Sequence, residues 1–136
     1  SLYFIGHTKA LVRYENGWST VTNGHFGHLA AESTMVFVSD FAGSIFRFDG
    51  ASCSPIFSGA VNIAHLYADH GTLWAEADMK RNEPHVLIRF DAASARETRR
   101  YSLASGTALS PGICDMITDE NGVLWLATND GLWKVQ

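Results

Sequence analysis

The amino-acid sequence predicts an all-β fold built from repeated antiparallel hairpins, and two observations support that prediction. Short runs of aromatic and β-branched residues alternate with Gly, Asn and Asp, which is the pattern of short strands joined by tight turns. The same strand–turn–strand unit also recurs about four times along the 136 residues. Helical periodicity is scarce, and the one short stretch that could be helical, Ala92–Thr98, serves equally well as a turn.

The clearest copy of the unit is the last one in the chain. It has three apolar segments, Ile113–Thr118, Val123–Thr128 and Leu132–Val135, separated by two turns. The turns contain Asn121-Gly122 and Asp130-Gly131, pairs that readily take the positive φ angles of tight hairpins. This copy therefore predicts three consecutive antiparallel strands.

Two features of this copy recur in the earlier ones. An aromatic residue stands in the middle of one strand, at intervals of 33, 37 and 51 residues, which bracket the period of roughly 40 to 50 residues typical of propeller blades. The following strand repeats the order apolar, apolar, basic, apolar, and we expect its basic residue to lie at a sheet edge with its stem packed and its head in water. The aromatic positions are Phe4, Phe37, Trp74 and Trp125, and the repeated strands are Leu11–Tyr14, Ile45–Phe48, Leu87–Phe90 and Leu132–Val135.

The repeat predicts β-propeller blades of four antiparallel strands, because one sheet cannot bury both of its faces and radial stacking of sheets can. The approximate repeats are 1–24, 25–58, 59–105 and 106–136, and together they form a single segment of about three to four blades. We expect the first blade to lack its innermost strand and the last blade its outermost. The chain is thus expected to be part of a larger propeller or, less favoured, to associate with copies of itself.

The last repeat resembles a known family. Arg100–Leu103, Gly106–Leu109 and Ile113–Lys134 follow the two-component regulator propeller repeat, with Asp119, Gly122, Leu124-Trp125, Thr128 and Gly131-Leu132 at its characteristic positions. The resemblance implies a non-enzymatic, ligand-sensing propeller in the extracytoplasmic part of a hybrid histidine kinase-like protein, and hence a periplasmic or extracellular location. The Asp-Gly-x-Leu-Trp core is also similar to that of streptogramin lyase-like propellers. A lyase-like enzyme and a structural protein-interaction propeller therefore remain alternatives.

Composition argues against several classes of partner. The formal net charge is −4 and the Lys and Arg residues are dispersed, so we expect no nucleic-acid partner. Apolar runs of membrane-spanning length are absent from the sequence, so we expect no membrane contact from this segment. The two cysteines, Cys53 and Cys114, lack CxxC spacing, and their redox state stays open.

Histidines raise the question of metal binding and catalysis. His25-x-x-His28, and His65 with His70 across a turn, lack a third ligand in a supporting element, so we expect no metal and no cofactor. His65 lies on an innermost strand and could face the central channel as a general base. Nothing in the sequence pattern supplies its carboxylate partner, so no catalytic residue is assigned.

The expected binding site lies on one face of the propeller. In propellers the loops between second and third strands share a face with the connections between blades, and ligands commonly bind there. The segment Asp78–His85 lengthens one of these turns, and long irregular insertions often carry function. A solvated charged loop is the alternative explanation. The candidate ligand-binding residues, for a small molecule or glycan, are His7, Asp40, Asp78, Lys80, Arg81, Glu83, His85 and Asn129. Trp74, Trp125 and Trp133 are expected to pack between blades.

Overall fold

The computed structural model describes residues 2–6, 9–104 and 112–135. Within these ranges the secondary structure is all-β, and Ala92–Thr98 contains a turn and the start of a strand. The strands are β1 (Leu2–Ile5), β2 (Leu11–Tyr14), β3 (Trp18–Thr22), β4 (Phe26–Glu32), β5 (Met35–Asp40), β6 (Ile45–Phe48), β7 (Cys53–Phe57), β8 (Asn62–Asp69), β9 (Thr72–Asp78), β10 (Val86–Asp91), β11 (Glu97–Ser102), β12 (Ile113–Thr118), β13 (Leu124–Thr128) and β14 (Gly131–Lys134).

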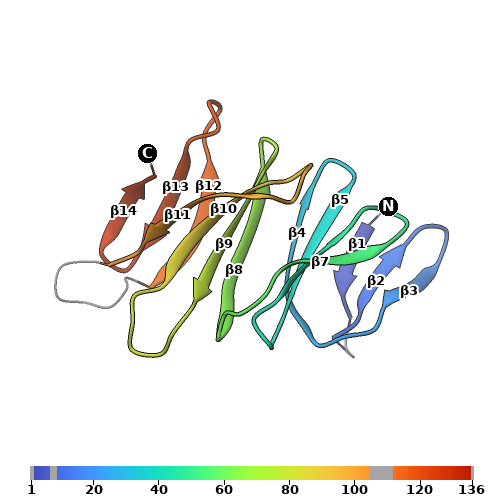
Figure 1. The fold of residues 1–136 in the computed structure, drawn as a ribbon. Helices are drawn as coiled ribbons and strands as arrows, with labels where there is room; N and C mark the ends of the chain where they lie inside the picture. The colour runs from blue at the N-terminus through green and yellow to red at the C-terminus, as the bar shows by residue number, and fades with distance from the viewer. Residues whose placement is uncertain (1, 7–8, 105–111, 136) are drawn as a thin grey trace.

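The strands form four separate antiparallel sheets, each a simple meander. The first sheet is β1-β2-β3, the second β4-β5-β6-β7, the third β8-β9-β10-β11 and the fourth β12-β13-β14. Figure 1 shows the sheets side by side in chain order, with the two chain ends at opposite ends of the row. This arrangement confirms the prediction of stacked propeller blades.

Three apolar layers hold the row together, one between each pair of neighbouring sheets. Strand β9 shows how the sequence builds two of them. Leu73, Ala75 and Ala77 pack toward the second sheet, and Trp74 packs toward the fourth. Because successive side chains point to opposite faces of a strand, one continuous apolar run fills both layers.

The first strands of the second, third and fourth sheets share an irregularity at the same place. The pairing register shifts between Phe26 and His28 in β4, between Ile63 and His65 in β8, and between Ile113 and Asp115 in β12. Such bulges redirect the side chain that follows them. Three neighbouring innermost strands thus carry an ionisable side chain, His28, His65 or Asp115, directly after the bulge.

The pairing register confirms the repeated aromatic–basic pattern and corrects it in the first sheet. Strands are counted here from the innermost strand of a complete blade, so β2, β6, β10 and β14 are third strands and β1, β5, β9 and β13 are second strands. Each basic residue of a third strand pairs with an aromatic residue of the second strand: Arg47 with Phe37, Arg89 with Trp74, Lys134 with Trp125, and Arg13 with Tyr3. Tyr3 therefore occupies the repeat position that the sequence pattern assigned to Phe4. The misassignment moved one strand by a single residue, which exchanges its two faces.

The expected edge position of the basic residue is wrong in the first three sheets. There the third strand is internal, because a fourth strand, β3, β7 or β11, pairs beside it. Arg89 is exposed, and its guanidinium carbon lies 5.6 Å from the centre of the Trp74 ring. Lys134, on the edge strand β14, lies 5.6 Å from the Trp125 ring. Here the basic head group covers an aromatic face of its own sheet.

Candidate functional site

The loops that follow second strands lie against the connections between sheets, along one side of the row (Figure 1). Val61 N, in the connection before β8, donates to the carbonyl of Asp78 at 2.7 Å, and Leu103 N donates to the carbonyl of His85 at 2.9 Å. Phe41 N makes the equivalent bond to the carbonyl of His25 at 3.2 Å. These bonds assemble one loop face, as expected from the sequence.

A buried carboxyl group lies just beneath this face. Glu76, near the end of β9, is only 3% exposed. Its Oε1 lies 2.7 Å from Nδ1 of His65, and its Oε2 lies 2.7 Å from Nδ1 of His85. Both oxygens are therefore bound to imidazoles, which satisfies a carboxyl group that would otherwise be costly to bury.

Strand register explains how three residues far apart in sequence meet. The bulge after Ile63 places His65 directly opposite Glu76 across the β8–β9 pair. On the other side of β9, Leu87 of β10 pairs with Glu76. His85 precedes Leu87 by two residues and reaches Glu76 diagonally from just before the start of β10. The carboxyl group is thus held from both neighbours of its own strand.

Two more ionisable groups extend this arrangement. Asp78 Oδ2 lies 4.0 Å from Nε2 of His85. The ring of His28, on β4 of the second sheet, lies 6.0 Å from the ring of His65. Burial, and secondarily the charge of His65, lowers the pKa of His28 below 6.5, while Glu76 opposes that shift. We call His28, His65, Glu76, Asp78 and His85 the histidine–glutamate cluster.

The cluster provides oriented hydrogen-bonding groups. When both Nδ1 atoms donate a hydrogen to Glu76, the two rings are fixed in place. Within the residues that the structure describes, three or more His, Cys, Asp or Glu side chains nowhere converge as metal ligands would. The imidazoles that Glu76 orients are chemically suited to binding a polar ligand or to moving a proton.

The predicted site residues fall into three groups. Asp78 and His85 belong to the cluster. Lys80 and Glu83 form an exposed ion pair at 3.3 Å in the β9–β10 loop, which also carries the exposed Arg81.

Two of the remaining predicted residues, Asp40 and Asn129, do not join the cluster. Asp40 Oδ1 accepts hydrogen bonds from the backbone of Ala42 and Ser44 and so stabilises its own turn. Asn129, in the turn between β13 and β14, accepts a hydrogen bond from the thiol of Cys114 at 3.6 Å. His7 lies outside the described residues.

Sequence reasoning missed Glu76, and it considered His28 and His65 without assigning either to the binding site. The available signal for Glu76 was a charged residue inside the apolar run Leu73–Ala77. The equivalent positions in the second and fourth sheets hold Ser39 and Ala127, each paired like Glu76 with the residue after the bulge. Stacking of the sheets therefore does not require an acid at this position.

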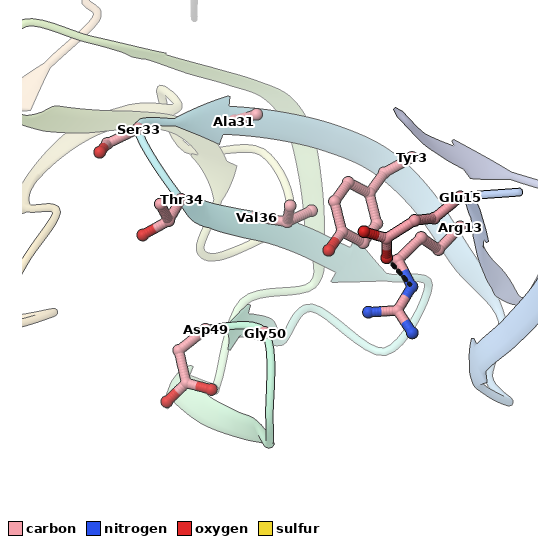
Figure 2. Close-up of a pocket in the computed structure, with 9 residues that line it drawn as sticks. All are labelled: Tyr3, Arg13, Glu15, Ala31, Ser33, Thr34, Val36, Asp49 and Gly50. Atoms are coloured by element: carbon pink, nitrogen blue, oxygen red, sulfur yellow. Dashed lines mark ion pairs between the residues drawn. The ribbon is translucent and has the colours of Figure 1, made fainter. Parts of the chain in front are cut away.

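Apart from the histidine–glutamate cluster, a cavity lies between the first and second sheets. This cavity has a volume of about 420 Å³ and opens beside the β4–β5 hairpin and the β6–β7 turn. Figure 2 shows the residues that line it. It is lined by Tyr3, Arg13, Glu15, Ala31, Ser33, Thr34, Val36, Asp49 and Gly50. Hydroxyl groups and charges of both signs face it, and Arg13 pairs with Glu15 at 3.8 Å.

The cavity marks a difference between two equivalent sheet interfaces. Between the second and third sheets, Arg47 donates to the carbonyls of Ala92 and Ala93 in the neighbouring turn. Arg13 occupies the same repeat position one sheet earlier and faces the turn at Asp49 and Gly50 across the cavity. Because Arg13 pairs with Glu15 instead, the space beside the turn stays open.

Comparisons with known proteins bear on the fold. No protein-family model matches this chain, and no curated protein matches its sequence. Among solved structures, Sqt1 of Saccharomyces cerevisiae is similar, with a TM-score of 0.55 and 14% identity over 93% of this chain. The fold is that of β-propeller blades. The chain spans 39% of the length of Sqt1. Among the described residues, no helix is long and apolar enough to cross a membrane.

Proposed function

We propose that this chain is a non-enzymatic recognition segment of a β-propeller that binds a small polar ligand, such as a glycan, on its loop face at the histidine–glutamate cluster. The observation that carries the proposal is the buried carboxyl of Glu76 between two imidazoles. Burying such a group stabilises a fold poorly compared with apolar packing, and the equivalent positions Ser39 and Ala127 show that the blade does not need it. Polar groups that are buried although they lower the stability of the fold commonly serve to bind a ligand.

The wider role rests on the resemblance of the last repeat. Residues 99–136 follow the two-component regulator propeller repeat, and this supports placing the module in the extracytoplasmic, ligand-sensing part of a signalling protein. A periplasmic or extracellular location is part of that proposal. The protein-interaction alternative draws support from the exposed apolar residues Phe41 and Val61 on the same face.

A binding screen with matched variants tests the proposal. Purified chain is screened by thermal shift against a panel of neutral oligosaccharides and small carboxylic acids, and hits are titrated by calorimetry. Replacing Glu76 with Gln should weaken binding of a true ligand by at least about tenfold, because the amide cannot accept a hydrogen at both positions. The triple change of Lys80, Arg81 and His85 to Ala should also weaken it. Glu97→Gln, on the outermost strand β11, is the control and should bind normally.

The outcomes separate the candidate roles. Binding that is unchanged in both the Glu76 variant and the triple variant would refute the site. A failure of every small molecule, combined with binding of a protein that Phe41→Ser abolishes, would favour the protein-interaction role.

A lyase-like activity is a second candidate because His65 is oriented by a carboxyl group and is partly exposed, as a general base must be. In that case His65→Gln should abolish turnover of a bound substrate while the ligand still binds. Equal loss of binding and turnover would argue for recognition alone.

A further inference from the structure

The hydrogen bonds of the histidine–glutamate cluster determine which kind of group a ligand must bring to it. An ionised carboxyl group only accepts hydrogen bonds, so the hydrogen between Glu76 and His65 belongs to Nδ1 of the histidine, 2.7 Å from the carboxyl oxygen. A neutral imidazole that carries its hydrogen on Nδ1 has a lone pair on Nε2. The side chain of His65 is 37% exposed, so a ligand that donates a hydrogen bond can reach the ring.

Asp78 adds a second carboxyl group to the face of the sheet that carries His65. It lies two residues after Glu76 on β9, so both side chains point to the same face. The side chain of Asp78 is 23% exposed. Lys80, in the loop that follows, is engaged in its ion pair with Glu83. A ligand group that donates hydrogen bonds and also carries a positive charge, such as an ammonium group, fits these acceptors best.

Strand register places an aromatic ring at the position that corresponds to Asp78 in the neighbouring sheet. Glu76 corresponds to Ser39 in the second sheet, so Asp78 corresponds to Phe41, two residues further along the chain in each case. Phe41 is 59% exposed on the loop face. An apolar ring and an acidic group therefore take equivalent places in adjacent sheets.

A cavity of about 530 Å³ opens beside this ring. Its wall is mainly apolar and is formed by loops rather than by the faces of sheets, with Gly24, His25, Asp40, Phe41 and Ala42 as its lining residues. An added Cβ at Gly27 would lie 3.2 Å from the ring of Phe41, so the ring reaches the residue next to His28 of the cluster. An exposed aromatic ring in such a place can pack against the apolar C–H face of a sugar ring.

We propose, on the basis of the binding role proposed above, that the ligand of the loop face is an amino sugar, with its ammonium group bound to Nε2 of His65 and to the carboxylate of Asp78 and its ring packed on Phe41. The aromatic ring accepts many sugars, and the hydrogen-bond acceptors select among them. A neutral sugar brings hydroxyl donors but no charge. A carboxyl group on the sugar would face Asp78 and Glu76 with like charge, which opposes binding.

Three linear glucose trimers that differ in one substituent test this selectivity. The primary hydroxyl groups are kept in the first, replaced by amino groups in the second and oxidised to carboxyl groups in the third. In calorimetric titrations of the purified chain near neutral pH, the amino trimer should bind at least about fivefold more tightly than the neutral trimer, because charge-assisted hydrogen bonds are stronger. The carboxyl trimer should bind at least about fivefold more weakly than the neutral trimer.

Variants assign the selectivity to individual side chains. Asp78→Asn should remove most of the advantage of the amino trimer and change binding of the neutral trimer little. Phe41→Ala should weaken binding of the amino and neutral trimers alike, by at least about threefold, and Phe41→Trp should retain it. Trp18→Ala, at an exposed aromatic residue on β3, is the matched control and should bind the trimers normally. Unchanged circular dichroism confirms that the variants fold.

The outcomes separate the class of ligand from the site itself. A carboxyl trimer that binds as tightly as the amino trimer, and loses its binding in Glu76→Gln, would overturn the amino-sugar assignment and keep the proposed site. Equal binding of the amino and neutral trimers would also overturn the assignment. Failure of all three trimers would overturn it as well, and the wider screen above would then decide the proposed function alone. Binding of the amino trimer that Glu76→Gln leaves unchanged would count against both.

Discussion

Leu87 offers a quantitative test of the stacked-sheet core. It is fully buried in the apolar layer between the third and fourth sheets. Replacing it with Ala removes buried methyl groups and leaves a cavity in a layer fixed by two sheets, so we expect a loss of about 3 kcal/mol in the free energy of unfolding. With a urea dependence of about 1.5 kcal/mol per M, the unfolding midpoint should fall by roughly 2 M.

Leu132 is the matched control, because it is the same residue at the same repeat position and is exposed. Leu132→Ala should change the free energy of unfolding by no more than about 0.5 kcal/mol. An equal loss of unfolding free energy for the two leucines, or a loss at Leu87 below about 1 kcal/mol, would refute the packing described between the third and fourth sheets.

Three further predictions concern single residues. Gly43 has φ +78°, and an added Cβ would lie 1.9 Å from the carbonyl oxygen of Ala60, so Gly43→Ala should cost at least about 2 kcal/mol in urea unfolding. Gly71→Ala, at φ +71° in open space, should cost clearly less, and equal costs would contradict the close contact. The lowered pKa of His28 means that the unfolded chain takes up its proton first as the pH falls below about 6.5, so stability should decline between pH 7 and pH 5. That decline should be smaller in His28→Gln, and an unchanged pH profile would count against its buried setting. Burial raises the pKa of the Cys53 thiol, whereas Cys114 is exposed, so a thiol reagent at pH 8 should modify Cys114 first by mass spectrometry; the reverse order would be inconsistent with the structure.

Much of the fold is predictable from the sequence because the signals are local and repeated. The turn pairs Asn121-Gly122 and Asp130-Gly131 and the alternation of side chains along strands define the hairpins. Four copies of the unit then imply stacking, since a single sheet leaves one face open. The single-residue error at Phe4 arose because Tyr3 and Phe4 are both aromatic, and only the pairing of Arg13 with Tyr3 distinguishes the two faces.

The candidate site is less predictable because it depends on register. Glu76 and His65 are eleven positions apart, and they meet only because a bulge shifts the β8–β9 pairing by one residue. His28 approaches from another sheet, so its place requires the stacking of β4 beside β8 as well as the register within each sheet. Polar loop residues such as Lys80 and Glu83 are visible in the sequence, but their composition alone does not distinguish a ligand contact from an exposed ion pair.

The protonation pattern of the imidazoles tests the central claim, the buried Glu76 held between His65 and His85, most directly. Nitrogen-15 correlation spectra of the histidine side chains identify which ring nitrogen carries the hydrogen in the neutral form. We predict hydrogen on Nδ1 of both His65 and His85, with slow solvent exchange that Glu76→Gln accelerates at both rings. Hydrogen on Nε2 of both neutral rings, or spectra that do not respond to Glu76→Gln, would contradict the account.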